Sequence, residues 1–274
     1  MIEKTINTTA FLAGRWPLEN HLPTLIFISG ASSNSTFWKC QMEGLSGRFN
    51  TLAIDLPGHG RSPGKGEKKI EDYAAFVNAF IQEIQPPFPI PCGFSMGGAV
   101  ALELFISHSH GLKGGVIINS GARLNILPLI LRKIREKNKN GGNLEDLFAE
   151  LAISRASDAV HMKQMVDASS NANTQVTMND VHACNTFNAR ERLKTISLPV
   201  LVMTSEDDVL TPSQKGMYLA ENIQGAKYIH IRDAGHFAPI EQPDAVNDAI
   251  REFVLDVVSE ARAKIIDTPP SAAA

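Results

Sequence analysis

The sequence predicts an α/β protein in which a doubly wound, mostly parallel sheet carries a helical cap inserted between two of its strands. Short apolar runs rich in β-branched residues alternate along the chain with amphipathic stretches of helical length, and parallel strands need such crossover connections. Most of these runs are apolar throughout, which is typical of strands covered by helices on both faces. The long segment between Ile118 and Pro199 has no comparable run, so it is predicted to be an insertion.

Each element follows from the local pattern of residues between turn formers. Strands are predicted where apolar and β-branched residues run together, at 22–28, 50–54, 89–93, 112–118, 199–204 and 226–231. Helices are predicted where apolar residues recur with helical spacing, at 36–48, 70–84, 96–107, 212–222 and 245–260. Within the insertion the helical pattern recurs at 127–137, 144–154 and 158–168.

These elements divide the chain into three parts. Residues 1–120 and 191–262 are predicted to form the α/β core, and residues 121–190 a helical cap that lies on the sheet. Residues 263–274 end in a run rich in proline and alanine, and they are predicted to be a disordered tail.

Composition and charge restrict the kind of partner. The chain has 274 residues, of which 43% are hydrophobic, and its net charge is −3. It therefore lacks the broad basic surface that nucleic-acid binding usually needs. A small-molecule partner is predicted, with no nucleic acid, and the oligomeric state is left open.

The cysteines and the N-terminus indicate a location. Cys40, Cys92 and Cys184 are few, odd in number and not arranged as a CxxC pair, which indicates a reducing compartment and no zinc or redox site. The first residues lack a signal-peptide pattern, and no apolar run approaches about 18 residues. A cytoplasmic protein without a membrane segment is expected.

The run Gly93-Phe94-Ser95-Met96-Gly97 joins a predicted strand to a predicted helix. This is the setting of the GxSxG nucleophile elbow, in which a serine in a sharp, strained turn needs small residues on both sides. At the start of a helix, Ser95 gains from the positive end of the helix dipole, and the Met96 amide is available to an oxyanion. The pentapeptide alone is a weak signal, but its context makes Ser95 the predicted nucleophile.

Four segments of the chain, which follow one another in the family's order, resemble the α/β-hydrolase superfamily, specifically its capped esterase and lactonase-like branch. The segments are Ile28-Ser29-Gly30-Ala31 with Trp38, Asp55-Leu56-Pro57-Gly58-His59-Gly60-Arg61-Ser62, the serine turn, and Ser205-Glu206-Asp207-Asp208 with Ala234-Gly235-His236-Phe237. The resemblance covers nearly the whole chain. It implies the α/β-hydrolase fold with a helical cap, acyl-transfer chemistry, and no cofactor or metal.

A serine hydroxyl is a poor nucleophile at neutral pH, so a histidine must accept its proton and a carboxylate must hold that histidine's tautomer. The resemblance implies that His236, in the loop after the last predicted strand, is the base. Asp207 and Asp208 both follow the strand 199–204, and spacing alone does not separate them. The resemblance favours Asp208, because the family commonly has its acid three residues after the small residue that ends the strand, here Ser205. The resulting chain order of serine, aspartate and histidine is the one expected of this fold.

The oxyanion hole needs a second backbone donor besides Met96, and the resemblance places it at Ala31, in the loop after the first predicted strand. Many relatives have His-Gly at this turn, whereas this sequence has Ser29 followed by glycine. Local hydrogen bonds are expected to anchor the loop instead, from Ser32, Ser33 and Asn34. Three neighbours of these groups are expected to bind the substrate: Gly30, Phe94 and Phe237.

Other polar and apolar features are interpreted as structural or as parts of the cap. His59 and Arg61 belong to the polar segment 55–62, which in this family orders a loop beside the active site. The basic residues of the cap are interpreted as a solvated helix face: Arg132, Lys133, Arg135, Lys137 and Lys139. An apolar lining for the substrate is expected from Leu127, Leu129, Ile130, Phe148 and Met162 if they face inward.

The sequence thus predicts a carboxylesterase-like serine hydrolase, which cleaves a carboxylic ester or a related acyl compound through an acyl-enzyme on Ser95. One alternative uses the same triad for cleavage of a C–C bond, a lactone or a thioester, or for lyase chemistry. A second alternative is a non-catalytic ligand receptor on the same fold, because fold alone does not dictate function.

Overall fold

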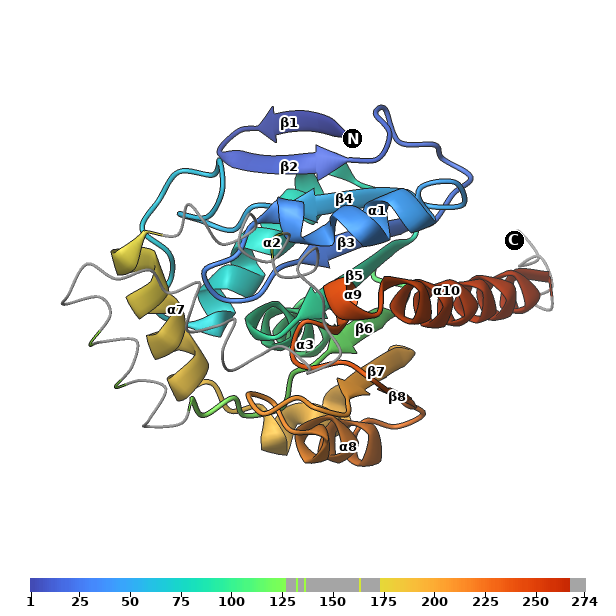
Figure 1. Ribbon diagram of the computed structural model, residues 1–274. Coiled ribbons are helices and arrows are strands. Elements are labelled where there is room, and N and C mark those ends of the chain that lie inside the picture. Colours follow the sequence, from blue (N-terminus) through green and yellow to red (C-terminus); the bar gives the residue numbers. More distant parts are fainter. Residues whose placement is uncertain (127–131, 133–135, 137–162, 164–172, 267–274) are drawn as a thin grey trace, which may run out of the picture.

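The computed structural model describes residues 1–126, 132, 136, 163 and 173–266 (Figure 1). Its centre is an eight-stranded sheet. The strands are β1 (Ile2–Ile6), β2 (Thr9–Ala13), β3 (Thr24–Ile28), β4 (Asn50–Ile54), β5 (Pro89–Phe94), β6 (Gly115–Ile118), β7 (Val200–Ser205) and β8 (Lys227–Ile231).

The strands lie in the order β1-β2-β4-β3-β5-β6-β7-β8. β1 pairs antiparallel with β2, and β2 pairs antiparallel with β4. All pairs from β4 to β8 are parallel, so the predicted fold class, a doubly wound and mostly parallel sheet, is confirmed. The strand order reverses at β3, and ligands of such sheets bind beyond the carboxyl ends of the strands near this reversal.

Helices cover both faces of the sheet (Figure 1). One face is covered by α2 (Ile70–Ile84), α3 (Met96–Ser107), α7 (Thr174–Thr186) and α8 (Ser213–Asn222). The other face is covered by α1 (Lys39–Leu45), α9 (Ala238–Glu241) and α10 (Pro243–Ile266). Two 3₁₀ helices, η1 (Ser35–Trp38) and η2 (Arg190–Thr195), complete the described elements. No helix in the described parts of the chain is long and apolar enough to cross a bilayer.

The apolar runs of the strands supply a core on each face of the sheet. Along β3, Ile26 and Ile28 belong to the core shared with α2 and α3, whereas Leu25 and Phe27 belong to the core beneath α1 and α10. Successive side chains of a strand point to opposite faces. A strand with a helix layer on both sides is therefore apolar at every position, as the sequence pattern indicated.

Three predicted elements have the observed bounds, and one predicted helix is divided into two. The strand 50–54 and the helices 70–84 and 96–107 are correct to the residue. The predicted helix 36–48 is divided into η1 and α1. It begins with a 3₁₀ turn, and the Asn34 side chain caps this turn by accepting a hydrogen bond from the Thr36 amide at 2.9 Å.

Five elements were not predicted: β1, β2, α7, η2 and α9. β1 is mostly exposed and so carries no apolar run, although its pairing with β2 completes the edge of the sheet. α7 is rich in polar and β-branched residues and has no clear apolar stripe, so its position depends on what it packs against.

Parts of the sequence prediction lie outside the described residues. These are the helices predicted at 127–137, 144–154 and 158–168, apart from Arg132, Glu136 and Lys163. The expected apolar cap lining and most of the basic cap residues lie there too. At the C-terminus, α10 includes residues 263–266, which the sequence predicts to belong to the disordered tail. Residues 267–274 lie outside the described part of the chain.

The three cysteines give a test of this packing. Cys92 and Cys184 are buried, and burial raises the pKa of both thiols above the usual range, whereas Cys40 is partly exposed. Because the thiolate is the reactive form, we expect Ellman's reagent to modify Cys40 alone within minutes in the native protein. All three should react after unfolding in guanidinium. Rapid release of more than one equivalent from the native protein would contradict the described core.

Candidate active site

Ser95 lies in a sharp turn between β5 and α3. Its backbone has φ 53° and ψ −117°, a conformation that costs a residue with a side chain about 1–3 kcal/mol. The Ser95 amide donates to the Ile118 carbonyl at 3.0 Å, and the Ser120 hydroxyl donates to the Ser95 carbonyl at 2.7 Å. These bonds from the end of β6 hold the turn, so the serine lies at the carboxyl edge of the sheet and at the amino end of α3.

Close approach of three backbone segments requires the glycines around the serine. A Cβ on Gly93 would lie 2.1 Å from the Gly97 carbonyl oxygen, and a Cβ on Gly97 would lie 2.1 Å from the Ile28 carbonyl oxygen. Both obstacles are backbone atoms that no side-chain rotation can move. The small residues of the motif are thus explained by sterics, independently of any catalytic role.

His236 lies between Ser95 and Asp208. Its Nε2 is 2.9 Å from the Ser95 hydroxyl oxygen, and its Nδ1 is 2.8 Å from Asp208 Oδ2. The side chains of His236 and Asp208 are 5% and 0% exposed. Asp207, the other candidate acid, is exposed, and its amide donates to the Ala234 carbonyl at 2.9 Å. The structure therefore brings three of the four predicted residues into one chain of hydrogen bonds.

Asp208 is held as an ionised carboxylate by the loop that follows it. Its Oδ1 accepts hydrogen bonds from the amides of Leu210 and Thr211 at 2.9 and 2.8 Å, and the Thr211 hydroxyl donates to Oδ2 at 2.5 Å. Burial acts to raise the pKa of Asp208, but the charge and hydrogen bond of His236 and the hydrogen bonds from Thr211 outweigh it, so the pKa lies below its ordinary value. The carboxylate therefore accepts from Nδ1–H, which leaves Nε2 free to accept a proton from Ser95.

Asn119, directly after β6, braces the loop that carries the histidine. Its side-chain nitrogen donates to the His236 carbonyl at 2.8 Å and lies 3.2 Å from the Gly235 carbonyl oxygen. Its side-chain oxygen accepts a hydrogen bond from the Ser205 hydroxyl at 3.1 Å. One asparagine thus links the ends of β6 and β7 to the loop after β8.

Glu241 of α9 holds the same loop from the other side. Its buried carboxylate accepts hydrogen bonds from the amides of Gly235 and Phe237, at 3.0 and 2.9 Å. These two residues flank His236. The peptide groups on both sides of the histidine are therefore fixed by one side chain.

Sequence reasoning did not identify Thr211, Asn119 or Glu241. Asn119 and His236 are 117 positions apart, so no local pattern joins them. One signal was present: Asn119 is a polar residue directly after a buried strand, at the sheet edge where ligand sites of parallel sheets lie.

The residues expected to bind substrate lie beside the histidine and the nucleophile. The ring centroids of Phe94 and Phe237 are 4.9 and 5.5 Å from that of His236. Phe94 is only 2% exposed, so its ring supports the imidazole from the core side. A Cβ on Gly30 would lie 3.2 Å from Ser95 Cβ, and its absence lets the loop after β3 approach the nucleophile. Contact of these residues with substrate stays a prediction.

The two amides predicted to form the oxyanion hole have different surroundings. Met96 is the first residue of α3, so its amide belongs to the N–H groups that have no acceptor within the helix. The hydrogen bonds of the described residues include none from the Ala31 amide. Both donors are thus available to a ligand in the parts of the chain that the structure describes.

The loop that carries Ala31 was expected to be held by local hydrogen bonds, and it is held by a distant helix as well. Asn34 does bond locally, by capping η1. The amide and hydroxyl of Ser32, however, bond to Asp180 and Thr177 on α7. The buried Ser33 hydroxyl has no partner among the described residues. The Ser33 amide does bond locally, to the Gly30 carbonyl at 3.3 Å. Local anchoring is therefore wrong for Ser32, because a helix from a distant part of the chain lies against this turn.

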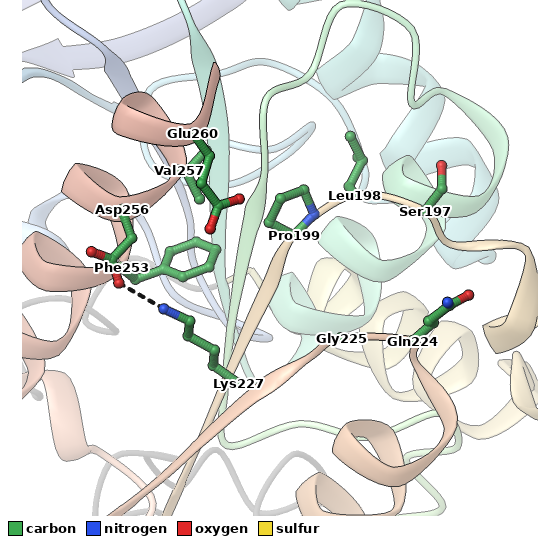
Figure 2. Close-up of a pocket in the computed structure, with 10 residues that line it drawn as sticks. All are labelled: Ser197, Leu198, Pro199, Gln224, Gly225, Lys227, Phe253, Asp256, Val257 and Glu260. Carbon is green, nitrogen blue, oxygen red and sulfur yellow. Dashed lines mark hydrogen bonds and ion pairs between the residues drawn. The ribbon is translucent and has the colours of Figure 1, made fainter. Parts of the chain in front are cut away.

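A pocket of about 190 Å³ lies elsewhere on the molecule (Figure 2). It is bounded by the residues before and at the start of β7 and β8 and by the last turns of α10, among them Pro199, Lys227 and Glu260. The candidate site lies after the carboxyl ends of the same strands. This pocket is therefore separate from it. In the described parts of the chain no group of three or more His, Cys, Asp or Glu side chains is arranged to hold a metal ion.

Comparisons with known proteins agree with this geometry. The sequence profile described as the alpha/beta hydrolase family matches residues 25–249. The chain is 26% identical to a candidate carbamate hydrolase of Pseudomonas syringae pv. syringae (strain B728a), over 85% of this chain and 93% of the relative. It is 24% identical to 3-oxoadipate enol-lactonase 1 of Acinetobacter baylyi, over 86% of this chain and 90% of the relative.

A solved structure has the same fold. The enol-lactonase from Burkholderia xenovorans LB400 matches with a TM-score of 0.81 and 24% sequence identity, over 93% of this chain and 100% of that one. At this level of identity the match establishes the fold and leaves the substrate to other evidence.

The bracing of the histidine loop can be tested at Glu241. In Glu241→Gln, one of the two backbone amides faces an NH₂ donor instead of a carboxylate oxygen. We expect the free energy of unfolding to fall by about 1–3 kcal/mol and kcat for a short p-nitrophenyl ester to fall about tenfold to a hundredfold. The matched control is Glu206→Gln, because Glu206 is exposed and accepts a hydrogen bond from the Asp233 amide at 3.3 Å. Wild-type kcat in Glu241→Gln would contradict this role.

Proposed function

Because the chain belongs to the alpha/beta hydrolase family, we propose that it is a serine hydrolase that cleaves a carboxylic ester through an acyl-enzyme on Ser95. The observation that carries the proposal is the unbroken chain of hydrogen bonds from Ser95 through His236 to Asp208. A strained serine aligned with a buried histidine and carboxylate favours catalysis over the binding of a ligand alone.

The first step is attack of the Ser95 oxygen on the carbonyl carbon of the ester. His236 Nε2, 2.9 Å from that oxygen, accepts the hydroxyl proton as the C–O bond forms. The negative charge that develops on the carbonyl oxygen is stabilised by the amides of Met96 and Ala31, the first of which also lies at the positive end of α3.

Asp208 holds the imidazole in the tautomer that the reaction needs. Because its carboxylate accepts from Nδ1 at 2.8 Å, the unprotonated nitrogen is the one that faces Ser95. When His236 becomes an imidazolium, the buried negative charge of Asp208 stabilises it. The lowered pKa of Asp208 keeps that charge present throughout the neutral range.

The second half of the reaction reuses the same groups. His236 donates its proton to the leaving alkoxide, the bond between the carbonyl carbon and that oxygen breaks, and the acyl group stays on Ser95. A water molecule then gives a proton to Nε2 and attacks the acyl carbon. The bond between that carbon and the Ser95 oxygen breaks, His236 returns the proton to this oxygen, and the acid is released. No step requires a redox cofactor.

The substrate is proposed to be a small molecule with an ester carbonyl, open or cyclic. The enol-lactonase of Acinetobacter baylyi is a relative over 86% of this chain, which favours testing a lactone beside a simple ester. We propose residues 121–190 as the cap that selects between them. The location is proposed to be cytoplasmic, supported by three cysteines of which none forms a disulfide.

Replacement of the nucleophile is the first test. Ser95→Ala removes the attacking oxygen and should lower kcat for a short p-nitrophenyl ester by at least about a thousandfold. A panel of esters, lactones, thioesters and β-diketones, assayed with wild type and variant, identifies the bond that is cleaved. Wild-type activity in Ser95→Ala would contradict the mechanism, and turnover of only the diketones would replace ester hydrolysis with C–C bond cleavage.

The neighbouring aspartates provide a matched pair of variants. Asp208→Asn places an amide opposite Nδ1 and favours the wrong tautomer, so kcat should fall about a hundredfold to ten-thousandfold. Asp207→Asn makes the same replacement of a carboxylate by an amide at the exposed neighbour, and it should keep kcat within about threefold of wild type. The reverse ranking of the two variants would assign the acid to Asp207.

A further inference from the structure

The loop that carries Ala31 is anchored on α7 at the next residue. Ser32 has φ 58°, in the left-handed region that serine rarely adopts. Its amide donates to Asp180 Oδ2 at 2.9 Å, and its hydroxyl donates to Thr177 Oγ1 at 2.8 Å. Both acceptors belong to α7, which follows Ser32 by more than half the length of the chain. The strained turn is thus held by a helix between β6 and β7.

Asp180 is the centre of a buried charged cluster. Its side chain is 0% exposed, and its carboxylate accepts hydrogen bonds from the Ser32 amide, from His59 Nε2 at 2.9 Å and from the Tyr73 hydroxyl at 2.5 Å. These partners come from the loop after β3, the segment 55–62 and α2. One carboxylate therefore fixes three parts of the core relative to α7.

His59 supplies the opposite charge. Its Nδ1 is 3.1 Å from the Pro57 carbonyl oxygen, which can only accept, and its Nε2 faces the Asp180 carboxylate. Both ring nitrogens then donate, which makes the ring an imidazolium. Burial acts to lower the pKa of His59, but the charge and hydrogen bond of Asp180 outweigh it, so the pKa is raised.

The cluster is close to the oxyanion loop without belonging to the triad. In the described parts of the chain, no hydrogen bond joins Asp180 directly to Ser95, Asp208 or His236. Its hydrogen bond to the oxyanion loop is to the amide of Ser32, directly after Ala31. A backbone donor displaced by about 1 Å loses much of its effect on an oxyanion.

We propose that Asp180 is a positioning residue for the oxyanion hole, which holds Ser32 so that the Ala31 amide points at the developing oxyanion. The inference rests on the proposed function, because it takes ester hydrolysis and the Ala31 donor from it. It adds that α7, a helix of the proposed cap, sets the geometry of a backbone donor in the core. The contribution of this helix is therefore to the chemical step.

The test compares turnover with the binding of an oxyanion mimic. Asp180→Asn keeps the size of the side chain but removes the charge and directs an NH₂ group at a donor. We expect kcat for a short p-nitrophenyl ester to fall about tenfold to a hundredfold, with KM within about threefold. The inhibition constant of an aryl trifluoromethyl ketone, whose adduct with Ser95 carries an oxyanion, should rise by the factor by which kcat/KM falls. Rates are expressed per active site, titrated with a fluorophosphonate.

Two further variants separate positioning from general support of the fold. Tyr73→Phe removes another donor to the same carboxylate without touching Ser32, so it should lower the melting temperature and leave kcat and the inhibition constant unchanged. Thr177→Val removes only the acceptor of the Ser32 hydroxyl and buries no unpaired charge. It should fold even if Asp180→Asn does not, with kcat lowered about threefold to tenfold.

The outcomes distinguish this inference from the proposed function. If the ketone fails to inhibit wild type, or Ser95→Ala keeps full activity, the proposed function has failed. If the ketone inhibits wild type but its inhibition constant and kcat are unchanged in Asp180→Asn, only the role of Asp180 is overturned. Where Asp180→Asn does not fold, unchanged values in Thr177→Val overturn the proposed control of the oxyanion loop by α7, because that variant removes the other hydrogen bond from Ser32 to this helix. Equal losses of kcat in Asp180→Asn and Tyr73→Phe would likewise overturn it, since they would indicate a general structural effect.

Discussion

The rest of the site depends on a backbone conformation that a serine adopts only under constraint. Ser95 is held at φ 53° because β5 ends against α3 with no room for side chains at Gly93 and Gly97. Hydrogen bonds to Ile118 and Ser120, at the end of β6, hold the residue in this strained conformation. The hydroxyl is thereby fixed at the edge where the loops after β7 and β8 meet, and these loops carry Asp208 and His236.

Each group of the site comes from a different loop, so rigidity has to come from side chains that join the loops. Asn119, Thr211 and Glu241 do this for the histidine and its carboxylate. Asp180 does the equivalent for the loop that carries Ala31. A parallel sheet aligns the strand ends, and buried polar side chains then fix the loops to within hydrogen-bond distance of one another.

The residues proposed to react were predictable from the sequence, and those that support them were not. Ser95 lies in a local motif, and the resemblance to the α/β-hydrolase superfamily indicated Asp208 and His236. The position of Ser32 against Asp180 depends on α7, which has no clear apolar stripe and bonds to a turn 148 positions earlier in the chain. β1 was not predicted for a related reason. Most of its residues are exposed and form no apolar run, and the strand is defined by its pairing with β2. Long-range pairs of this kind become visible only in the folded chain.

The central claim is that Ser95 is the nucleophile, and the most direct measurement is the site of covalent modification by a fluorophosphonate. Peptide mapping by mass spectrometry, with residual esterase activity measured on the same samples, should find one adduct per chain on Ser95, with activity lost in proportion. The account would be contradicted by an adduct on another residue, or by full activity in protein that is completely modified at Ser95.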